Sequence, residues 1–515
     1  MLTPFKNEPF TDFTLPDNRS RMEETLSRVE AELGRTYPLI IGGERVSTAQ
    51  TFVSINPSDK DQVVATFSKA GVDEANRAIE VAYQRFTYWS RVPPDERANI
   101  LLRAANIMRK RRFELTAWMV FEVGKNWLEA DADVAEAIDY CEFYAREMLR
   151  YAEGQPLTEL PGEHNTYVYL PLGVVAVIPP WNFPLAILVG MTTAALVTGN
   201  TVVLKPASDS PTIGYKFVEI MEEAGLPPGV LNYIPGSGGE IGDFIVSHPK
   251  TRMIAFTGSK AVGLRINELA AKPQKGQKWI KRVIAEMGGK DAIIMDDEFP
   301  DWDYAIDQII VSAYGYQGQK CSAASRLIVV DSIYDKFIDA LVDKVKTIDI
   351  GPAKENHFMG PVINERAERS ILEYIEIGKT EGKLLTGGKK APGNGYYIEP
   401  TVFSDVDPYA RIAQEEIFGP VLSVIRAKDY DHAIEIANST EYGLTGAVFT
   451  LNPDKIHKAK QEFFVGNLYI NRKCTGALVG SQPFGGFNMS GTDSKAGGRD
   501  YLLLFLQAKT ISHRY

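Results

Sequence analysis

The feature that most constrains the fold is a change of periodicity near residue 173, where short aliphatic runs begin to alternate with helical stretches. The runs have the length of buried strands and are rich in β-branched residues: GVVAVI at 173–178, TVVL at 201–204, VLNYI at 230–234 and MIAF at 253–256. Helical patterns separate them, at 185–198, 212–224 and 239–247. Apolar strands that alternate with helices predict a parallel sheet with helices on both faces.

A second series of the same kind follows further along the chain: LIVV at 327–330, a helical stretch at 333–347, VLSVI at 421–425, AVF at 447–449 and NLYIN at 467–471. A chain of 515 residues is too long for one simple core. We therefore predict two α/β domains, with the boundary near Gly288–Gly289.

The remaining segments complete this domain plan. The first domain is expected to comprise 1–160 and 174–288, including an amphipathic N-terminal helix and the mostly helical stretch 72–152. The second domain is expected at 289–490. The segments 161–173 and 491–515 have the pattern of strands outside both sheets, whose exposed edges need a partner.

Composition excludes several classes of partner. The formal charge is −10, so no basic surface is expected and nucleic acid is an unsuitable partner. The most apolar stretch, 185–199, is too short to span a membrane, and anionic lipids attract basic proteins. Three cysteines give neither a disulfide framework nor a zinc spacing, and the N-terminus does not have the pattern of a secretory signal. We therefore expect a protein of the cytoplasm that holds no metal.

Two residues could carry covalent catalysis. Cys321 lies in GQKCSA and Glu286 lies in AEMGGKDA, 35 residues earlier. A thiol can attack a carbonyl carbon, and a carboxylate can then activate the water that hydrolyses the thioester. A lone cysteine is more often a buried apolar residue, so the pair alone is a weak signal.

Five further motifs make the signal strong. They are PWNFP at 180–184, LKPAS at 204–208, FTGS at 256–259, EEIFGPV at 415–421 and QPFGG at 482–486. In this order and at these intervals, over nearly the whole chain, the sequence resembles the aldehyde dehydrogenase family. The resemblance implies a Rossmann-like NAD-binding domain, an α/β catalytic domain and a small β arm that joins subunits into a homo-oligomer.

The resemblance also implies an NAD site, with NADP as a weaker alternative. The glycines of PGSGGEIG do not fit G-x-G-x-x-G, because the second gap is one residue too long, and on their own they indicate a turn before a helix. Ser259 is expected to cap a helix that faces the pyrophosphate, and Ser208 stands where many NAD-selective relatives carry Glu. The full predicted set is Ile178, Pro180, Trp181, Lys205, Ser208, Gly238, Gly242, Thr257, Gly258, Ser259, Met287, Gly288, Glu416 and Phe418.

For the chemistry, the resemblance makes Cys321 the nucleophile and Glu286 the general base. The side-chain amide of Asn182 would stabilise the oxyanion together with the backbone N–H of Cys321. On its own, Asn182 could equally be a turn residue between prolines.

The run NRKCTGALVGSQPFGG, the residues around Cys321 and the N-terminal extension resemble one branch of the family, which oxidises L-glutamate γ-semialdehyde to L-glutamate in proline and arginine breakdown. The predicted substrate contacts are Phe183, Lys320, Ser322, Gly476, Ala477 and Phe484. Three alternatives stay open here: an enzyme for another small semialdehyde, a CoA-acylating dehydrogenase, and a binding protein that has lost activity. Contact with a proline dehydrogenase is also open.

Overall fold

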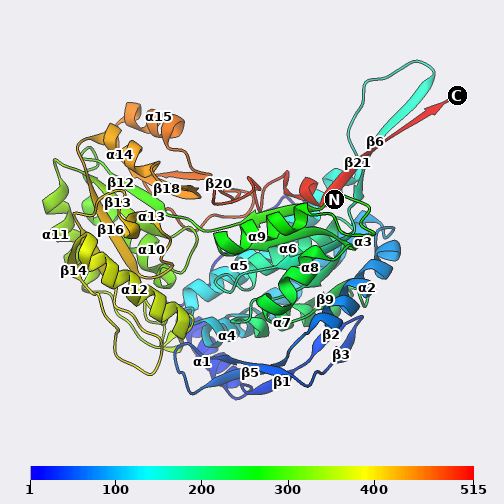
Figure 1. Cartoon of the computed structure of the whole chain (residues 1–515), viewed down its shortest axis with the longest axis horizontal. Helices are drawn as coiled ribbons and strands as arrows, with labels where there is room; N and C mark the ends of the chain where they lie inside the picture. Colours follow the sequence, from blue (N-terminus) through cyan, green and yellow to red (C-terminus); the bar gives the residue numbers. More distant parts are fainter. Residues whose placement is uncertain (1) are drawn as a thin grey trace.

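The computed structural model describes residues 2–515 and contains two domains, each built around a seven-stranded sheet, with a long two-stranded ribbon projecting from one of them (Figure 1). The first sheet has the order β11-β10-β7-β8-β9-β2-β3. Its strands are β2 (Leu39–Ile41), β3 (Glu44–Val46), β7 (Val174–Ile178), β8 (Thr201–Leu204), β9 (Leu231–Tyr233), β10 (Thr251–Thr257) and β11 (Arg282–Glu286). From β11 to β9 neighbouring strands are parallel, and the β2–β3 hairpin adds an antiparallel edge.

Helices cover both faces of the first sheet, as the alternation predicts. They are α2 (Val72–Trp89), α3 (Pro94–Lys110), α4 (Arg112–Val123), α5 (Trp127–Ala152), α6 (Ala186–Val197), α7 (Pro211–Glu223), α8 (Asp243–Ser247) and α9 (Lys260–Ala271). On the central strand, Val175 and Val177 join the core that contains α3 to α7. Val174 and Ala176 face the other way, into the core that contains α2, α8 and α9. The helical pattern at 239–247 begins as a π-helical turn, η1 (Gly238–Gly242).

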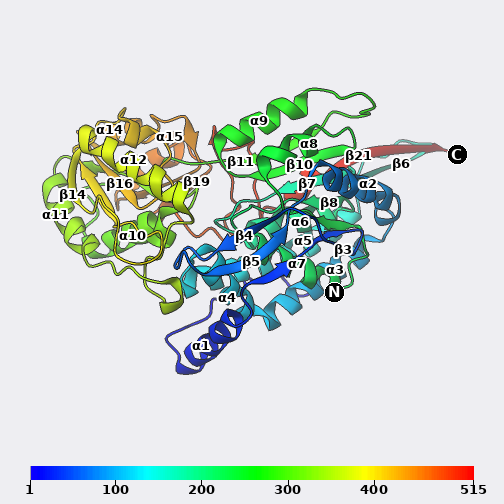
Figure 2. The same cartoon turned by 60° about the horizontal axis from the view of Figure 1, so that its bottom comes forward.

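The N-terminal extension packs beneath this domain. It consists of α1 (Pro16–Glu30) and a three-stranded sheet of β1 (Arg35–Tyr37), β5 (Val63–Ser68) and β4 (Thr51–Ile55). Met22, Leu26 and Val29 form the buried stripe of α1, and Figure 2 shows the helix at the outer side of the domain. The predicted amphipathic helix is therefore present.

The second sheet has the order β14-β15-β16-β13-β12-β18-β19. Its strands are β12 (Asp291–Met295), β13 (Ala324–Val330), β14 (Lys383–Thr386), β15 (Thr401–Ser404), β16 (Val421–Ala427), β18 (Thr445–Phe449) and β19 (Asn467–Ile470), and only β14 is antiparallel. The helices are α10 (Trp302–Tyr314) and α11 (Tyr334–Val345) on one face, and α12 (Glu365–Glu381), α14 (Tyr430–Ala437) and α15 (Pro453–Glu462) on the other. Smaller elements are α13 (Arg411–Gln414), β17 (Tyr442–Gly443), β20 (Phe487–Asn488) and the short 3-10 turns η2 (Gly315–Gly318) and η3 (Ala353–Glu355).

The projecting ribbon pairs segments that are far apart in the sequence. β6 (Glu163–Pro171) and β21 (Leu506–Arg514) run antiparallel, from Leu506 opposite Pro171 to Arg514 opposite Glu163. Beyond Leu506, every residue of β21 is exposed. Just before it, η4 (Tyr501–Phe505) is buried against the first domain and anchors the ribbon. Between residues 2 and 515, no helix combines the length and apolarity needed to cross a membrane.

Candidate active site

The first sheet has a topological switch point between β7 and β10. The chain winds from β7 through β8 to β9 on one side, then crosses to β10 and β11 on the other. In sheets of this kind, ligands bind beyond the carboxyl ends of the strands at such a point. The predicted residues lie at these ends: Ile178 and Pro180 at β7, Lys205 at β8, and Thr257 and Gly258 at β10.

The helices that begin at this edge include α6, α7 and α9, and the N-termini of α6 and α7 already bind a carboxylate of the protein. Asp133 accepts a bond from the Ala186 N–H at the start of α6, over 2.6 Å. Glu122 accepts bonds from Thr212 and Ile213 at the start of α7. A helix N-terminus favours an anion because its first N–H groups have no intrahelical partner.

At α9, no carboxylate within residues 2–515 accepts a bond from the helix N-terminus. Ser259 occupies its N-cap position in extended conformation, yet within residues 2–515 its hydroxyl makes no capping bond. Ser259 is exposed, and the neighbouring Gly258 is partly exposed. The sequence prediction that this helix faces the cofactor pyrophosphate is therefore compatible with the structure.

Lys205 and the glycine-rich segment 235–242 (the glycine segment) have properties that suit a ribose. The Lys205 side chain is buried, and its ammonium donates to the carbonyl of Pro206 over 3.0 Å. Burial lowers the pKa of this ammonium to about 8, although Asp209 opposes the shift. Such a group has spare donor capacity for ribose hydroxyls. Ser208 is exposed, with its hydroxyl 3.5 Å from the Gly236 carbonyl, and Gly238 and Gly242 lie in the π-helical turn beside it.

Glu416 and Phe418 approach the same region from the second domain. The Glu416 carboxylate accepts a bond from the Gly289 N–H over 3.0 Å, and it lies so close to Gly288 that any side chain there would collide with it. Burial raises the pKa of Glu416 to about 7. Phe418, with a left-handed backbone, meets Trp181 edge to face at 5.6 Å. These contacts bring the two domains together at the predicted nicotinamide end.

One pocket contains both predicted catalytic groups and most of the predicted substrate contacts. Its walls include nine residues selected from the sequence: Phe183, Thr257, Glu286, Met287, Cys321, Ser322, Gly476, Ala477 and Phe484. Glu136, Tyr140, Gln482 and Tyr501 complete the polar part of the lining. Cys321 and Glu286 thus share a single cavity, as a nucleophile and its hydrolytic base require.

The nucleophile lies on a segment with an unusual backbone. Between α10 and β13, Tyr316 and Gln317 both adopt left-handed conformations, with φ of 50° and 58°. Side-chain bonds stabilise this path: the Tyr316 hydroxyl donates to Val123 over 2.8 Å, and the Gln317 amide donates to Pro361 over 2.8 Å. Non-glycine residues persist in this conformation only when surrounding contacts impose it. The segment delivers Cys321 to the pocket immediately before β13 begins.

Electrostatics keep the thiol protonated in the unliganded site. Burial, followed by the nearby carboxyls of Asp291, Glu416 and Glu286, raises the pKa of Cys321 well above its ordinary value. The thiolate is the reactive form of cysteine. Attack on an aldehyde therefore requires that the sulfur first lose this proton, and Glu286 faces the same cavity as a candidate base for the hydrolytic step.

Glu286 ends β11 and is itself shielded from water. Burial raises the pKa of Glu286 to about 8, although bonds from Ser494 and Gly486 act in the opposite direction. The Ser494 hydroxyl donates to one carboxylate oxygen and the Gly486 N–H donates to the other. A carboxyl with a pKa near working pH is suited to general acid–base catalysis.

Asn182 and Lys320 do not lie on the pocket wall. The Asn182 amide donates to the carbonyl of Gln319, 3.0 Å away and two residues before Cys321, so it borders the nucleophile segment. The Lys320 ammonium, predicted to contact substrate, instead forms an ion pair with Glu129 of α5 at 2.6 Å. The partner is 191 residues away in sequence, and no local pattern could have indicated it.

Glu136 is the main pocket residue that the sequence analysis missed. Burial, with Asp133 nearby, raises the pKa of its carboxyl to about 8, while Lys125 opposes the shift. In sequence it is one of many acidic residues on a long helix. The one available signal was its helical spacing from Asp133 and Tyr140, which are buried residues of α5.

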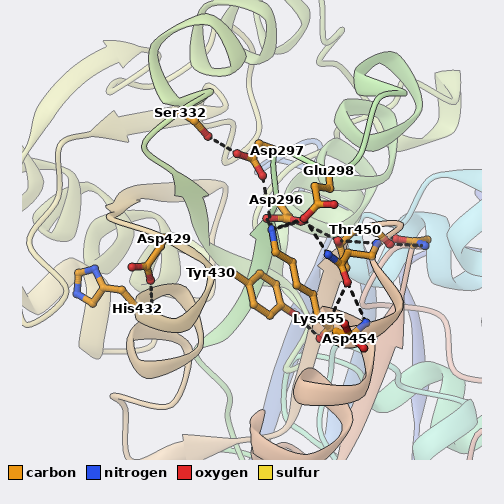
Figure 3. A network of polar contacts seen from close by, with 12 residues as sticks. Asp296, Asp297, Glu298, Ser332, Asp429, Tyr430, His432, Thr450, Asp454 and Lys455 are labelled. Carbon is orange, nitrogen blue, oxygen red and sulfur yellow. Dashed lines mark hydrogen bonds and ion pairs between the residues drawn. The ribbon is translucent and has the colours of Figure 1, made fainter.

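A separate acidic cluster lies at the other end of the second sheet. Asp296, Asp297 and Glu298 follow β12 with carboxylate oxygens close enough together to hold a cation (Figure 3). The Lys455 ammonium occupies that position, 2.7 Å from Asp296 and 2.9 Å from Glu298. Thr450 adds a bond to Asp296 over 2.7 Å. The protein therefore supplies its own cation here.

Comparison with known proteins agrees with this geometry. The chain is 59% identical over 516 residues to the 1-pyrroline-5-carboxylate dehydrogenase of a Geobacillus species, covering 100% of both chains. The structure of 1-pyrroline-5-carboxylate dehydrogenase from Thermus with bound NAD is 53% identical, with a TM-score of 0.99 and 100% coverage of both chains. Proline utilization A from Bdellovibrio bacteriovorus is 47% identical with a TM-score of 0.98, over 99% of this chain and 53% of that one.

The family model that matches is described as the aldehyde dehydrogenase family and spans residues 45–511. The aldehyde dehydrogenase fold therefore accounts for the two wound sheets, the projecting ribbon and the pocket that contains Cys321 and Glu286. By sequence, fold and site, this chain belongs to the aldehyde dehydrogenase family.

Proposed function

We propose that this protein oxidises L-glutamate γ-semialdehyde, the hydrolysed form of 1-pyrroline-5-carboxylate, to L-glutamate with NAD. The observation that carries the proposal is the lining of the Cys321 pocket, which offers complementary groups for both charges of an amino acid. Ser322, Gly476 and Ala477 supply a hydroxyl and backbone N–H groups for the α-carboxylate. Glu136 supplies a carboxylate for the α-ammonium.

The state of Glu136 supports this assignment. A shielded carboxyl with a pKa near 8 is protonated at neutral pH in the empty pocket. A substrate ammonium would stabilise its ionised form, since an opposite charge at close range lowers the pKa of a carboxyl. An aldehyde that lacks the amine would leave Glu136 without this partner.

The residues define the order of steps. Cys321 releases its proton to solvent water, and its sulfur attacks the aldehyde carbon, which gives a thiohemiacetal oxyanion. We assign stabilisation of that oxyanion to the Asn182 amide and the Cys321 N–H. When bound, NAD accepts the hydride that leaves the carbon. Glu286 then removes a proton from water, which attacks the thioester and releases the acid from Cys321.

The chain also has groups that fit NAD. The α9 N-terminus lacks an internal anion and suits a pyrophosphate. Lys205 is a buried donor beside the glycine segment, and Glu416 is a carboxylate with one backbone donor that can accept from ribose hydroxyls. These three groups lie at the edge where the sheet topology predicts a dinucleotide.

The experiment is a comparison of two aldehydes. The protein should reduce NAD with 1-pyrroline-5-carboxylate as substrate. Ser322→Ala and Glu136→Gln should each raise KM for the semialdehyde by roughly tenfold, because a charged group loses its hydrogen-bond partner. Propanal carries neither charge, so its kinetics should hardly change.

Ser481→Ala is the matched control, because Ser481 is an exposed serine outside the pocket. Equal losses for both aldehydes would show that Ser322 supports Cys321 and not the substrate. Efficient turnover of a semialdehyde without an amine, with none of the pyrroline, would favour the alternative of another small semialdehyde.

Self-association and location remain predictions. The β6–β21 ribbon projects from the body, and β21 is exposed at every residue beyond Leu506, which is the form of an edge that pairs with another subunit (Figure 1). We infer a homo-oligomer formed through this ribbon. Three free cysteines, two of them buried, suit the reducing cytoplasm.

A further inference from the structure

The segment that follows β20 is attached along the end of β11, the strand that carries Glu286. The Met287 N–H donates to Ser490 over 2.7 Å, and the Thr492 N–H donates to Ala285 over 3.0 Å. The Ala285 N–H in turn donates to the Thr492 hydroxyl over 3.1 Å, and Glu286 forms a β-bridge with Gly491. This segment therefore has a fixed register against the catalytic strand.

Within the segment, one side chain reaches the catalytic carboxylate. The Ser494 hydroxyl is buried and donates to Glu286, while the Gly486 N–H donates to the other oxygen of the same group. Gly485 approaches so closely that a side chain there would collide with the Ser494 backbone. The carboxylate is thus held between two donors on converging stretches of chain.

Lys495 fixes this arrangement from behind. Its ammonium donates to the carbonyls of Gly466 and Gly485, each over 2.6 Å, and to the Asn467 side chain over 3.1 Å. All three protons are therefore used in anchoring the segment. The ammonium also stays near Glu286 as a fixed positive charge.

The remaining charged or titratable groups that face Glu286 act differently. Asp493 adds a nearby negative charge, and Cys321 and Tyr501 lie across the pocket as neutral groups in the unliganded site. Burial is the dominant influence and favours the protonated acid. Among these neighbours, Ser494 and Gly486 are the direct donors, and bonds to the ionised form favour ionisation.

We propose that Ser494 is a positioning residue for the hydrolytic half of the reaction: its hydroxyl stabilises the ionised form of the Glu286 carboxylate and orients it toward the water that attacks the thioester. Ser494 does not touch the aldehyde or the cofactor in this role. It acts through Glu286, so it should affect hydrolysis of the thioester and leave formation of the thioester unchanged. The inference rests on the proposed role of Glu286 as the base, and it holds for any aldehyde that the protein oxidises.

The test separates the two half-reactions in time. Rapid mixing follows the burst of NADH, and acid quenching follows release of the carboxylic acid, across pH 6 to 9.5. Ser494→Ala should keep the burst, slow acid release roughly tenfold at pH 7 and move the midpoint of the pH profile upward, because Glu286 loses one donor to its charged form. Ser494→Thr retains a hydroxyl and should restore much of the rate.

Thr492→Val is the matched control, because it removes a hydroxyl from the same segment that bonds the backbone of β11 and not Glu286. Its acid release should follow the parent profile. Thermal melting and NAD binding of each variant report any loss of folding. A Ser494→Ala profile that superimposes on the parent, or a burst that slows in parallel with acid release, would overturn the inference.

Glu286→Gln in the same assay distinguishes the two possible failures. If it releases acid normally, the base assignment in the proposed function is wrong. If it releases acid slowly while Ser494→Ala is normal, only the role of Ser494 is wrong.

Discussion

The two seven-stranded sheets place opposite ends of their strands at the active site. In the first sheet, Ile178, Lys205, Thr257 and Glu286 lie at the carboxyl ends of parallel strands. In the second sheet, Cys321 precedes β13, so the nucleophile lies at the amino ends. The rule that ligands bind beyond carboxyl ends therefore describes the first sheet and not the second.

The side chains at the carboxyl ends of the second sheet explain why its active-site residues lie at the amino ends instead. Its switch point lies between β12 and β18, and there Asp296, Thr450 and Lys455 form the network of Figure 3. Asp296 is fully buried and its charge is matched by Lys455. The place that the topology offers to a ligand is filled by the side chains of the protein itself. Two sheets of similar topology can thus have a binding edge at opposite ends.

The largest expected loss of activity tests whether the amino ends of the second sheet supply the nucleophile. Cys321→Ala should lower aldehyde oxidation by roughly 10⁴-fold or more, because the reaction loses its nucleophile. NAD binding, measured by fluorescence titration, should stay near the parent value, because the cofactor groups belong mainly to the first sheet. A variant that keeps substantial turnover, or loses NAD binding, would break the division between the two sheets.

A smaller loss of activity is expected when Glu286, the residue of the first sheet that takes part in the chemistry, is replaced. Glu286→Gln should retain the burst of NADH and slow acid release by about 10²–10⁴-fold. Burial raises the Glu286 pKa to about 8, so the base form accumulates as pH rises through that value. Acid release by the parent should therefore increase through about pH 8 and level off above it, and the variant should lose this dependence. Rapid-quench measurements across pH check both outcomes.

The smallest effect concerns cofactor choice at the carboxyl end of β8. Ser208→Glu should lower kcat/KM for NADP by about tenfold relative to NAD, since an exposed carboxylate would repel a 2′-phosphate. Low salt should enlarge the difference, because solvent screens an exposed charge. An unchanged cofactor ratio would mean that position 208 does not face the ribose.

The sequence predicted the parts of the fold that are governed by local periodicity. The runs at 174–178, 201–204 and 324–330 form strands close to their predicted positions, and nine of the predicted site residues line one pocket. β12 was missed, because DAIIM is a single short run beside a catalytic motif. β15 was missed for a similar reason, since TVFS is brief and follows a long irregular segment.

Contacts between distant segments account for most of what the sequence could not predict in the site. Lys320 is paired with Glu129, and Ser494 reaches Glu286 across 208 positions. Neither partner is marked by a local pattern, because acidic residues on helices and serines in polar loops are common. The motif residues could be identified because short local sequence patterns mark them. No local pattern marks the residues that orient them.

The Lys455 network also affects how the stability of the second domain changes with temperature. The cost of removing charges from water falls as temperature rises, because hydration of ions carries a large negative entropy. A buried aspartate matched by an ammonium, with Glu298 and Thr450 in the same network, therefore becomes relatively more favourable on warming. This ionic network lies at the end of the second sheet that is remote from catalysis. The resistance of the second domain to heat can consequently be altered there while the nucleophile and its pocket stay unchanged.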